Sequence, residues 1–313
     1  MAWPLIRNMP AHFTFDFVKL APFAAVLSAI AIIASGVSYF SQGLNLGTDF
    51  QGGTEIQVQT QGPSPLGALR SSLSAMGAHD PKVQSFGAPN LAVLRFKSAE
   101  GVNAVADAKR VQDKLAAQFP GIQFKGTQAV GPSVSGELVK SGLIALSSAI
   151  VLMLFYIWFR FQLQFGFGAV IAIFHDVILT VGMLSIFQIE FSGASIAALL
   201  TIIGYSMNEK VITFDRLREN LRKYKKTPLR DVINLSENER LSRTLITGTT
   251  ALLALSGMLF LGGPALFPLI ITMVFGIILG TYSSIYVALP VILLWGVRRS
   301  DAEAVPLKPV GAR

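Results

Sequence analysis

Residues 165–187 read FGFGAVIAIFHDVILTVGMLSIF, and this stretch decides the class of fold. His175 and Asp176, near its middle, are its only titratable side chains. A helix crosses the hydrocarbon core of a bilayer with about 20 mostly apolar residues, and open sheets do not span lipid. The stretch therefore predicts a transmembrane helix. Five further segments share its length and apolar character: 20–40, 140–159, 193–214, 244–262 and 267–295.

The composition agrees with a membrane protein. Of 313 residues, 52% are hydrophobic and 14% are charged, and the mean hydropathy is +0.55; soluble domains carry roughly 25% charged residues. This excludes a soluble enzyme, a disordered chain and a nucleic-acid-binding domain. Cysteine is absent, and no HExxH, GxSxG, Walker or CxxC motif occurs. No enzymatic activity, cofactor or metal site is therefore expected.

The basic residues predict the orientation in the membrane. Segment 215–243 holds nine Lys and Arg, whereas the short connections 188–192 and 263–266 hold none. Because basic connections stay in the cytoplasm, we expect both termini there. The predicted parts are a cytoplasmic N-terminus with the first helix (1–41), a five-helix bundle (140–297) with a cytoplasmic loop (215–243), and a cytoplasmic tail (298–313). Within the loop, 215–230 reads either as a basic helix lying on anionic membrane lipid or as a solvated segment.

The insert between the first two helices, 42–139, is expected to fold as a small periplasmic domain. It carries eight basic and seven acidic residues, as a soluble domain would. Its pattern predicts an α+β fold of βαββαβ order, the order of ferredoxin-like domains. The expected strands are 54–60, 82–86, 91–97 and 122–130, and the expected helices are 65–77 and 103–119. Val105, Ala108, Val111 and Leu115 form the predicted buried face of the second helix.

Ionisable side chains inside spans are costly and indicate function. Asp176 lies mid-span beside His175, Glu209 and Lys210 lie near the predicted end of the fourth helix, and Arg243 opens the fifth. We expect Lys210 to snorkel to the interface. His175 is either a proton carrier or a structural group bonded to a carbonyl or hydroxyl.

A carboxylate facing a guanidinium on the next helix forms a pair that protonation switches. Antiparallel neighbours would place Glu209 and Arg243 at similar depth, with Asp176 passing protons to them. The predicted proton pathway is therefore His175, Asp176, Glu209 and Arg243. The alternative for Arg243 is a charge that only anchors the helix at the interface.

Several motifs occur together in order. They are GTDFQGGTEI (47–56), VGPSVSGEL (130–138), YIWFRFQLQFGFGAVIAIFHDVILTVG (156–182), GYSMNEKVITFDRLRENLR (204–222) and LSRTLITGTTALLAL (241–255). Together they resemble the SecD/SecF family of protein-export membrane proteins, a branch of the Resistance-Nodulation-Division superfamily. The family motif has Asp and then a small residue where this chain has Glu209 and Lys210, and GIDFTGG where this chain has GTDFQGG. Arg243 matches the family's functional arginine.

The resemblance implies a subunit that uses the proton motive force, with SecD, to assist late-stage export across the bacterial inner membrane. The implied partners are SecD, the SecYEG channel and exported preproteins, with YajC as a further candidate. Two other functions stay open: a lipid or small-molecule efflux half-transporter of the same superfamily, and a non-conducting scaffold of the channel.

Overall fold

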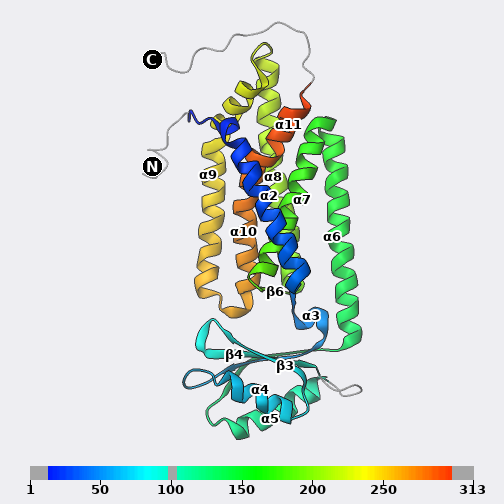
Figure 1. Cartoon of the computed structure of the whole chain (residues 1–313), viewed down its shortest axis with the longest axis vertical. Coiled ribbons are helices and arrows are strands. Elements are labelled where there is room, and N and C mark those ends of the chain that lie inside the picture. Colours follow the sequence, from blue (N-terminus) through cyan, green and yellow to red (C-terminus); the bar gives the residue numbers. More distant parts are fainter. Residues whose placement is uncertain (1–12, 98–103, 298–313) are drawn as a thin grey trace.

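The computed structural model describes residues 13–97 and 104–297. A long helical bundle carries a small α+β domain at one end (Figure 1). The N-terminal residues 1–12 and the expected cytoplasmic tail 298–313 lie outside the described residues.

Six helical runs form the bundle. Five are long and apolar enough to cross a membrane, which makes the chain a multi-pass membrane protein. The sixth, α8, is long enough but is not among the five, because polar residues such as Asn208 lie in its second half. The runs are α2 (Phe17–Gln42), α6 (Pro132–Arg160), α7 (Leu163–Ile186), α8 (Gly193–Lys223), α9 (Leu229–Leu261), and α10 (Phe267–Ser283) continuing through the π-helical η2 (Ser284–Ala288) into α11 (Leu289–Trp295).

Most of the segment 215–243 is helical, because α8 continues to Lys223 and α9 begins at Leu229. The predicted end of the fourth helix and the predicted start of the fifth are therefore wrong, and only 224–228 lies between the two helices. Leu217 and Leu221 of α8 are buried in one apolar cluster with Val232 and Ile233 of α9. This packing lets both helices continue past the expected membrane edge. The interpretation of 215–230 as a helix is correct as far as Lys223.

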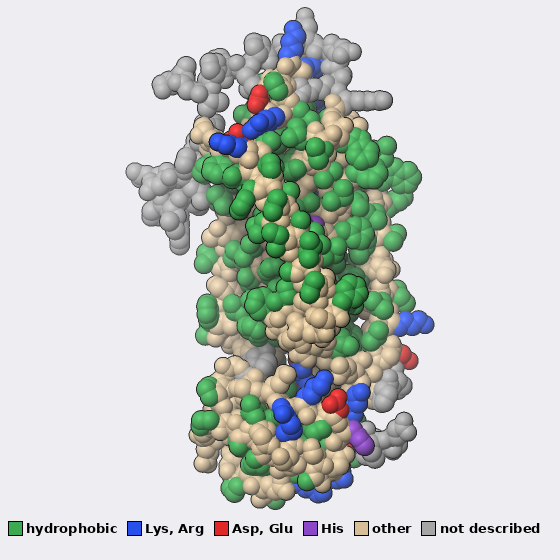
Figure 2. All heavy atoms as spheres, viewed as in Figure 1, with side chains coloured by type: hydrophobic (Ala, Val, Ile, Leu, Met, Phe, Trp, Pro, Cys, Tyr) green, Lys and Arg blue, Asp and Glu red, His purple; other side chains and the backbone are tan. Residues whose placement is uncertain are grey.

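Two glycines in α10 allow it to pack closely against α8. A Cβ at Gly276 would overlap Ile202, and one at Gly280 would lie 3.1 Å from the Cβ of Ser206. The pair therefore serves helix packing within this chain. The outside of the bundle is apolar, and Lys and Arg gather at its end and on the small domain (Figure 2).

The small domain has the βαββαβ order that the sequence predicts. Its sheet is antiparallel with strand order β3-β4-β2-β5, and the two helices cover the face turned away from the bundle (Figure 1). Ile56, Leu69, Leu94 and Leu115 are fully buried between them. The elements are β2 (Gly53–Gln59), α4 (Leu66–Ala75), β3 (His79–Phe86), β4 (Ala88–Lys97), α5 (Ala104–Gln118) and β5 (Gln123–Val130).

One residue of the predicted buried face is misplaced. Val105 is 67% exposed, whereas Ala108, Val111 and Leu115 are buried. Steps of three residues fall about 60° short of a helical turn, so a run at 105, 108 and 111 drifts around the helix. The buried face of α5 therefore begins at Ala108.

The segment after α2 attaches the small domain to the bundle. β1 (Asn45–Leu46) pairs in parallel with β6 (Glu190–Phe191), which lies between α7 and α8. In the short helix α3 (Thr48–Gln51), Asp49 Oδ2 accepts a hydrogen bond of 3.0 Å from the amide of Gly193, the first residue of α8. A carboxylate there also faces the positive end of the helix dipole.

The last glycine of the GTDFQGG motif, Gly53, is required for steric reasons. Gly53 has a φ of +116°, and a Cβ on it would lie 2.6 Å from the carbonyl oxygen of Phe96. Only glycine fits this conformation and this approach to the neighbouring strand.

Candidate functional site

Asp176 is the centre of a buried ion-pair cluster inside the bundle. Its carboxylate is 1% exposed. Its Oδ2 atom lies 3.0 Å from Nζ of Lys210 on α8 and accepts a hydrogen bond of 2.7 Å from Ser283 Oγ on α10. The hydroxyl of Ser206 on α8 also donates to Oδ2. Three helices therefore meet at one carboxylate, which agrees with the prediction that Asp176 is a buried group.

Lys210 does not snorkel, so that prediction is wrong. Its side chain is fully buried, and its ammonium contacts Asp176, Ser206 and, at 3.0 Å, Ser283. The prediction assumed that the fourth helix ends near residue 214. Because α8 continues to Lys223, its end lies more than three turns beyond Lys210, and a lysine side chain at 210 is too short to reach it.

His175 joins this cluster to α2. Its Nδ1 atom lies 3.0 Å from Asp176 Oδ1, and its Nε2 atom lies 3.1 Å from the hydroxyl of Ser28. Ser28 is 2.9 Å from the hydroxyl of Tyr282, which donates to the carbonyl of Ala24 at 2.8 Å. His175 thus contacts both a carboxylate and a facing hydroxyl, and a row of polar groups runs from Asp176 to α2.

Glu209 belongs to a second buried cluster, between α8 and α9. Its Oε2 atom lies 3.1 Å from an Nη atom of Arg240 and accepts a hydrogen bond of 3.2 Å from Thr244 Oγ1. Arg240 also binds Glu237 on its own helix, with Nε at 2.9 and 2.8 Å from the two carboxylate oxygens and the second Nη at 2.7 Å. The same Nη donates to Ser284 Oγ at 3.0 Å.

The predicted pair between Glu209 and Arg243 is wrong, because Arg240 takes that place. Arg243 is exposed, and it makes no ion pair with any residue that the structure describes. Arg243 is six residues after Glu237, which places it about 120° around the helix from that residue. The buried face of α9 passes through Glu237, Arg240 and Thr244.

Sequence reasoning missed Glu237 and Arg240, although one signal was available. An acid and a base three residues apart face each other on a helix, and Glu237 and Arg240 have this spacing. Placing the start of the helix at 244 left both residues in a loop. Only with α9 beginning at Leu229 do they enter the bundle.

Ser283 and Ser284 connect the two clusters. Ser283 binds Asp176 and Lys210, and the next residue binds Arg240. The π-helical η2 begins at Ser284, and such turns within helices occur often at functional sites. A shift of this turn would change both clusters together.

The arrangement suits proton movement within an apolar bundle. It combines carboxylates, an imidazole and hydroxyls, whose hydrogen bonds are able to rearrange with protonation. Among the residues described, no three His, Asp or Glu side chains are grouped so as to hold a metal ion.

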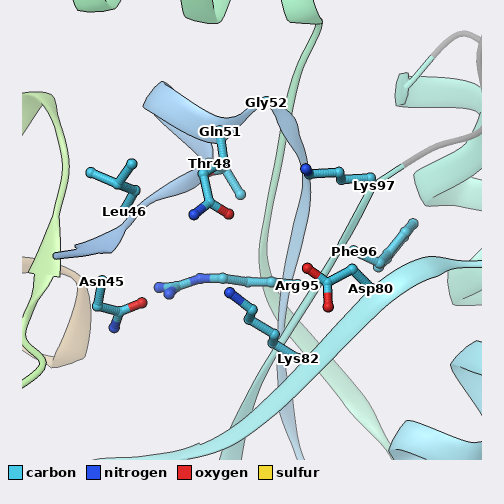
Figure 3. Close-up of a pocket in the computed structure, with 10 residues that line it drawn as sticks. All are labelled: Asn45, Leu46, Thr48, Gln51, Gly52, Asp80, Lys82, Arg95, Phe96 and Lys97. Carbon is cyan, nitrogen blue, oxygen red and sulfur yellow. The ribbon is translucent and has the colours of Figure 1, made fainter. Parts of the chain in front are cut away.

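A second charged location lies at the junction between the small domain and the bundle. Arg95 of β4 forms ion pairs with Glu55 of β2, at 2.8 Å, and with Glu190 of β6. Burial raises the pKa of Glu190, although Arg95 opposes this by favouring the charged form. Arg95 extends beside Lys82 and towards Asn45 along a small pocket (Figure 3).

Family models match most of the chain. The model described as the C-terminal part of the protein export membrane protein SecD/SecF matches residues 110–298, and the SecD/SecF GG motif matches residues 37–64. The latter covers the segment that joins α2 to the small domain.

Curated relatives match over nearly their full length. The protein translocase subunit SecF of Rhodobacter capsulatus is 41% identical over 317 residues, covering 96% of this chain and 95% of that protein. The subunit of the same name from Cereibacter sphaeroides is 39% identical, covering 95% and 94%.

The fold is similar to that of a solved translocon-associated membrane protein, SecDF from Thermus thermophilus. The TM-score is 0.82 with 29% sequence identity, over 94% of this chain. The chain spans only 40% of the length of that protein.

Proposed function

This chain belongs to the SecD/SecF family of protein-export membrane proteins, and we propose that it uses the proton motive force to assist the late stage of protein export. In this proposal it is the SecF-like subunit of a Sec translocase in the bacterial inner membrane. Protons would pass through Asp176 and Glu209, with His175 linking Asp176 to α2. The movement would be transmitted to the small domain.

The observation that supports this most strongly is the presence of two buried ion-pair clusters in an apolar bundle. Asp176, Glu209 and Lys210 are each at most 1% exposed. Structural packing alone gives little reason for such groups, since well-packed apolar residues would often be at least as stable as a buried ion pair. Their retention favours a role for the charges themselves.

The link between α8 and the small domain supports a mechanical output. Glu209 and Lys210 lie on α8, whose first amide binds Asp49. The strand just before α8 binds the small domain through Glu190 and Arg95. A displacement of α8 that follows protonation would therefore act directly on the domain.

For topology, we propose six spans, with α8 as the fourth, and a ferredoxin-like domain in the periplasm. The basic end of α8 and the start of α9 would lie in the cytoplasm. The chain has no cysteine, so single substitutions at the exposed residues Lys125 and Lys226 report directly. In spheroplasts, an impermeant thiol reagent should label Lys125→Cys and leave Lys226→Cys unlabelled. The reverse pattern would overturn the orientation.

We propose a SecD-like chain as the direct partner, because SecDF contains more than this chain covers. Only 6% of the residues along the apolar stretches of the outer helices α6 and α9 are buried, which leaves room for a neighbour. Arg243 lies exposed on α9, where a guanidinium facing lipid is costly, and contact with the partner would remove that cost. The SecYEG channel and exported preproteins complete the proposed assembly, with YajC as a further candidate.

The test is export into inverted membrane vesicles with and without this subunit, at constant ATP. The stimulation that the subunit provides should disappear when an uncoupler collapses the proton gradient. The ATP-driven motor step is measured separately under the same treatment as a control. If the stimulation is undiminished, the proposal is wrong and the non-conducting scaffold is favoured. If the subunit affects only the export of lipids or small molecules, the efflux half-transporter is favoured.

A further inference from the structure

The two clusters differ in charge balance. Among the buried side chains of the described bundle, the first cluster pairs Asp176 with Lys210. The second holds two carboxylates, Glu209 and Glu237, and only one cation, Arg240. With all groups ionised, the second cluster carries one uncompensated negative charge.

Among the residues that the structure describes, no other cation forms an ion pair with Glu209 or Glu237. Lys210 is adjacent to Glu209 in sequence, but its ammonium binds Asp176 and the hydroxyls of Ser206 and Ser283. The other titratable side chains that face the cluster are Tyr205 of α8 and Tyr286 of η2, and tyrosine is neutral near pH 7. Phe17 of α2, whose ring packs on Tyr286, adds no charge.

An uncompensated buried carboxylate costs several kcal/mol, and carboxylates that share one site do not both ionise readily. We propose that Glu209 and Glu237 share one proton as well as one guanidinium, and that Glu237 is a third proton-exchanging carboxylate of the pathway, beside Asp176 and Glu209. This inference rests on the proposed function for its role in export, but the shared proton itself is a property of the cluster.

The contacts place the two carboxylates in different states. Glu237 holds Arg240 through three contacts, at 2.9, 2.8 and 2.7 Å, whereas Glu209 holds it through one, at 3.1 Å. In the arrangement that we propose, the carboxylate with more contacts to Arg240, Glu237, is the ionised one, and Glu209 carries the shared proton. Transfer of the proton to Glu237 would move the guanidinium towards Glu209, and Ser284, bonded to Arg240, would carry the change to η2.

Infrared spectroscopy on the purified full chain in lipid nanodiscs tests the shared proton. Near pH 7 the wild type should show the carbonyl band of a protonated carboxylic acid, which shifts in D₂O. Glu237→Gln and Glu209→Gln each leave one carboxylate for Arg240, so both variants should lose the band. Glu237→Asp, which keeps the carboxylate, should retain it.

Glu239→Gln is the matched control. Glu239 lies on the same helix and pairs with Arg216 at 2.9 Å, but its side chain is 22% exposed, so its removal should leave the band unchanged. A wild type without an acid band, or a full band in both Glu237→Gln and Glu209→Gln, would overturn the inference. Loss of the band together with export that does not depend on the gradient would retain the shared proton and reject the proposed function.

Discussion

The small domain and the bundle differ in the charge that they bury and in the apolar side chains that they expose. In the domain, the fully buried side chains are mostly hydrocarbon, such as Leu94, and no Lys or Arg among its described residues is buried. In the bundle, Lys210 and Glu209 are buried, whereas Phe159 and Leu294 are 89% and 88% exposed. A domain in water and a bundle in lipid explain this difference, because exposed apolar surface costs free energy in water but not in lipid. The bundle is therefore free to keep charges inside for function.

The largest loss of stability should come from removing one charge of a buried ion pair in the bundle. Lys210→Met removes the cation from Asp176, so the free energy of unfolding should fall by about 3–5 kcal/mol. The double variant with Asp176→Asn removes both charges and should recover much of this loss. Lys125→Met, on the exposed face of the domain, should change it by less than about 0.5 kcal/mol. Denaturant unfolding in detergent measures all three variants. Equal stability of Lys210→Met and the wild type would contradict the view that the bundle interior holds a balanced ion pair.

Two leucines, one in each region, test how much a buried and an exposed apolar side chain contribute to stability. Leu94 is fully buried in the domain, and Leu294 is exposed on the bundle. Leu94→Ala leaves a cavity and should destabilise the domain by about 2–5 kcal/mol, seen as faster amide exchange in its strands. Leu294→Ala exchanges one lipid contact for another and should have almost no effect. A larger loss at Leu294 would show that this face packs against protein.

Two arginines of α9 allow a comparison of the buried side of this helix with its exposed side. Arg240→Lys keeps the charge but loses the planar fork that binds Glu237 and Glu209, so it should cost about 1–3 kcal/mol of stability. Arg243→Lys, at an exposed position, should leave the stability of the isolated chain unchanged. Thermal unfolding of the purified chain decides between them. A greater loss for Arg243→Lys would restore the pair expected from the sequence.

The smallest effect is expected where the two regions meet. Burial raises the pKa of Glu190 in the docked arrangement, whereas a carboxyl released into water has its ordinary pKa. Docking should therefore be strongest below that ordinary pKa and weaken as the pH rises through the raised one. Glu190→Gln is neutral at every pH and should abolish this dependence. Spin labels at Lys125 and Phe260 would follow docking by their separation, and identical pH profiles for both proteins would contradict it.

The sequence was sufficient to predict the order of helices and strands, but not where the bundle helices end or which of their faces meet. Alternating and helical patterns predicted the βαββαβ order, and long apolar runs predicted the bundle helices. Glu237 and Arg240 were missed, and the predicted role of Lys210 was wrong, because the roles of all three depend on where α8 ends and α9 begins. Those ends are set by tertiary packing of residues such as Leu217 and Val232, which overrides the local composition of a basic segment. Whether Arg240 or Arg243 faces Glu209 depends on the rotation of α9 about its axis relative to α8. The spacing of residues within α9 does not determine this rotation.

The central claim is that protons reach the export machinery through the buried carboxylates. The direct measurement is the rate of gradient-dependent export, normalised to assembled complex, for Glu209→Gln and Asp176→Asn. Glu209→Asp and Glu239→Gln, which removes a carboxylate at the partly exposed pair with Arg216, are the controls. We predict that the first two variants fall to the rate seen with an uncoupler and that both controls keep the wild-type rate. Wild-type export by both Glu209→Gln and Asp176→Asn would show that no proton path runs through these residues.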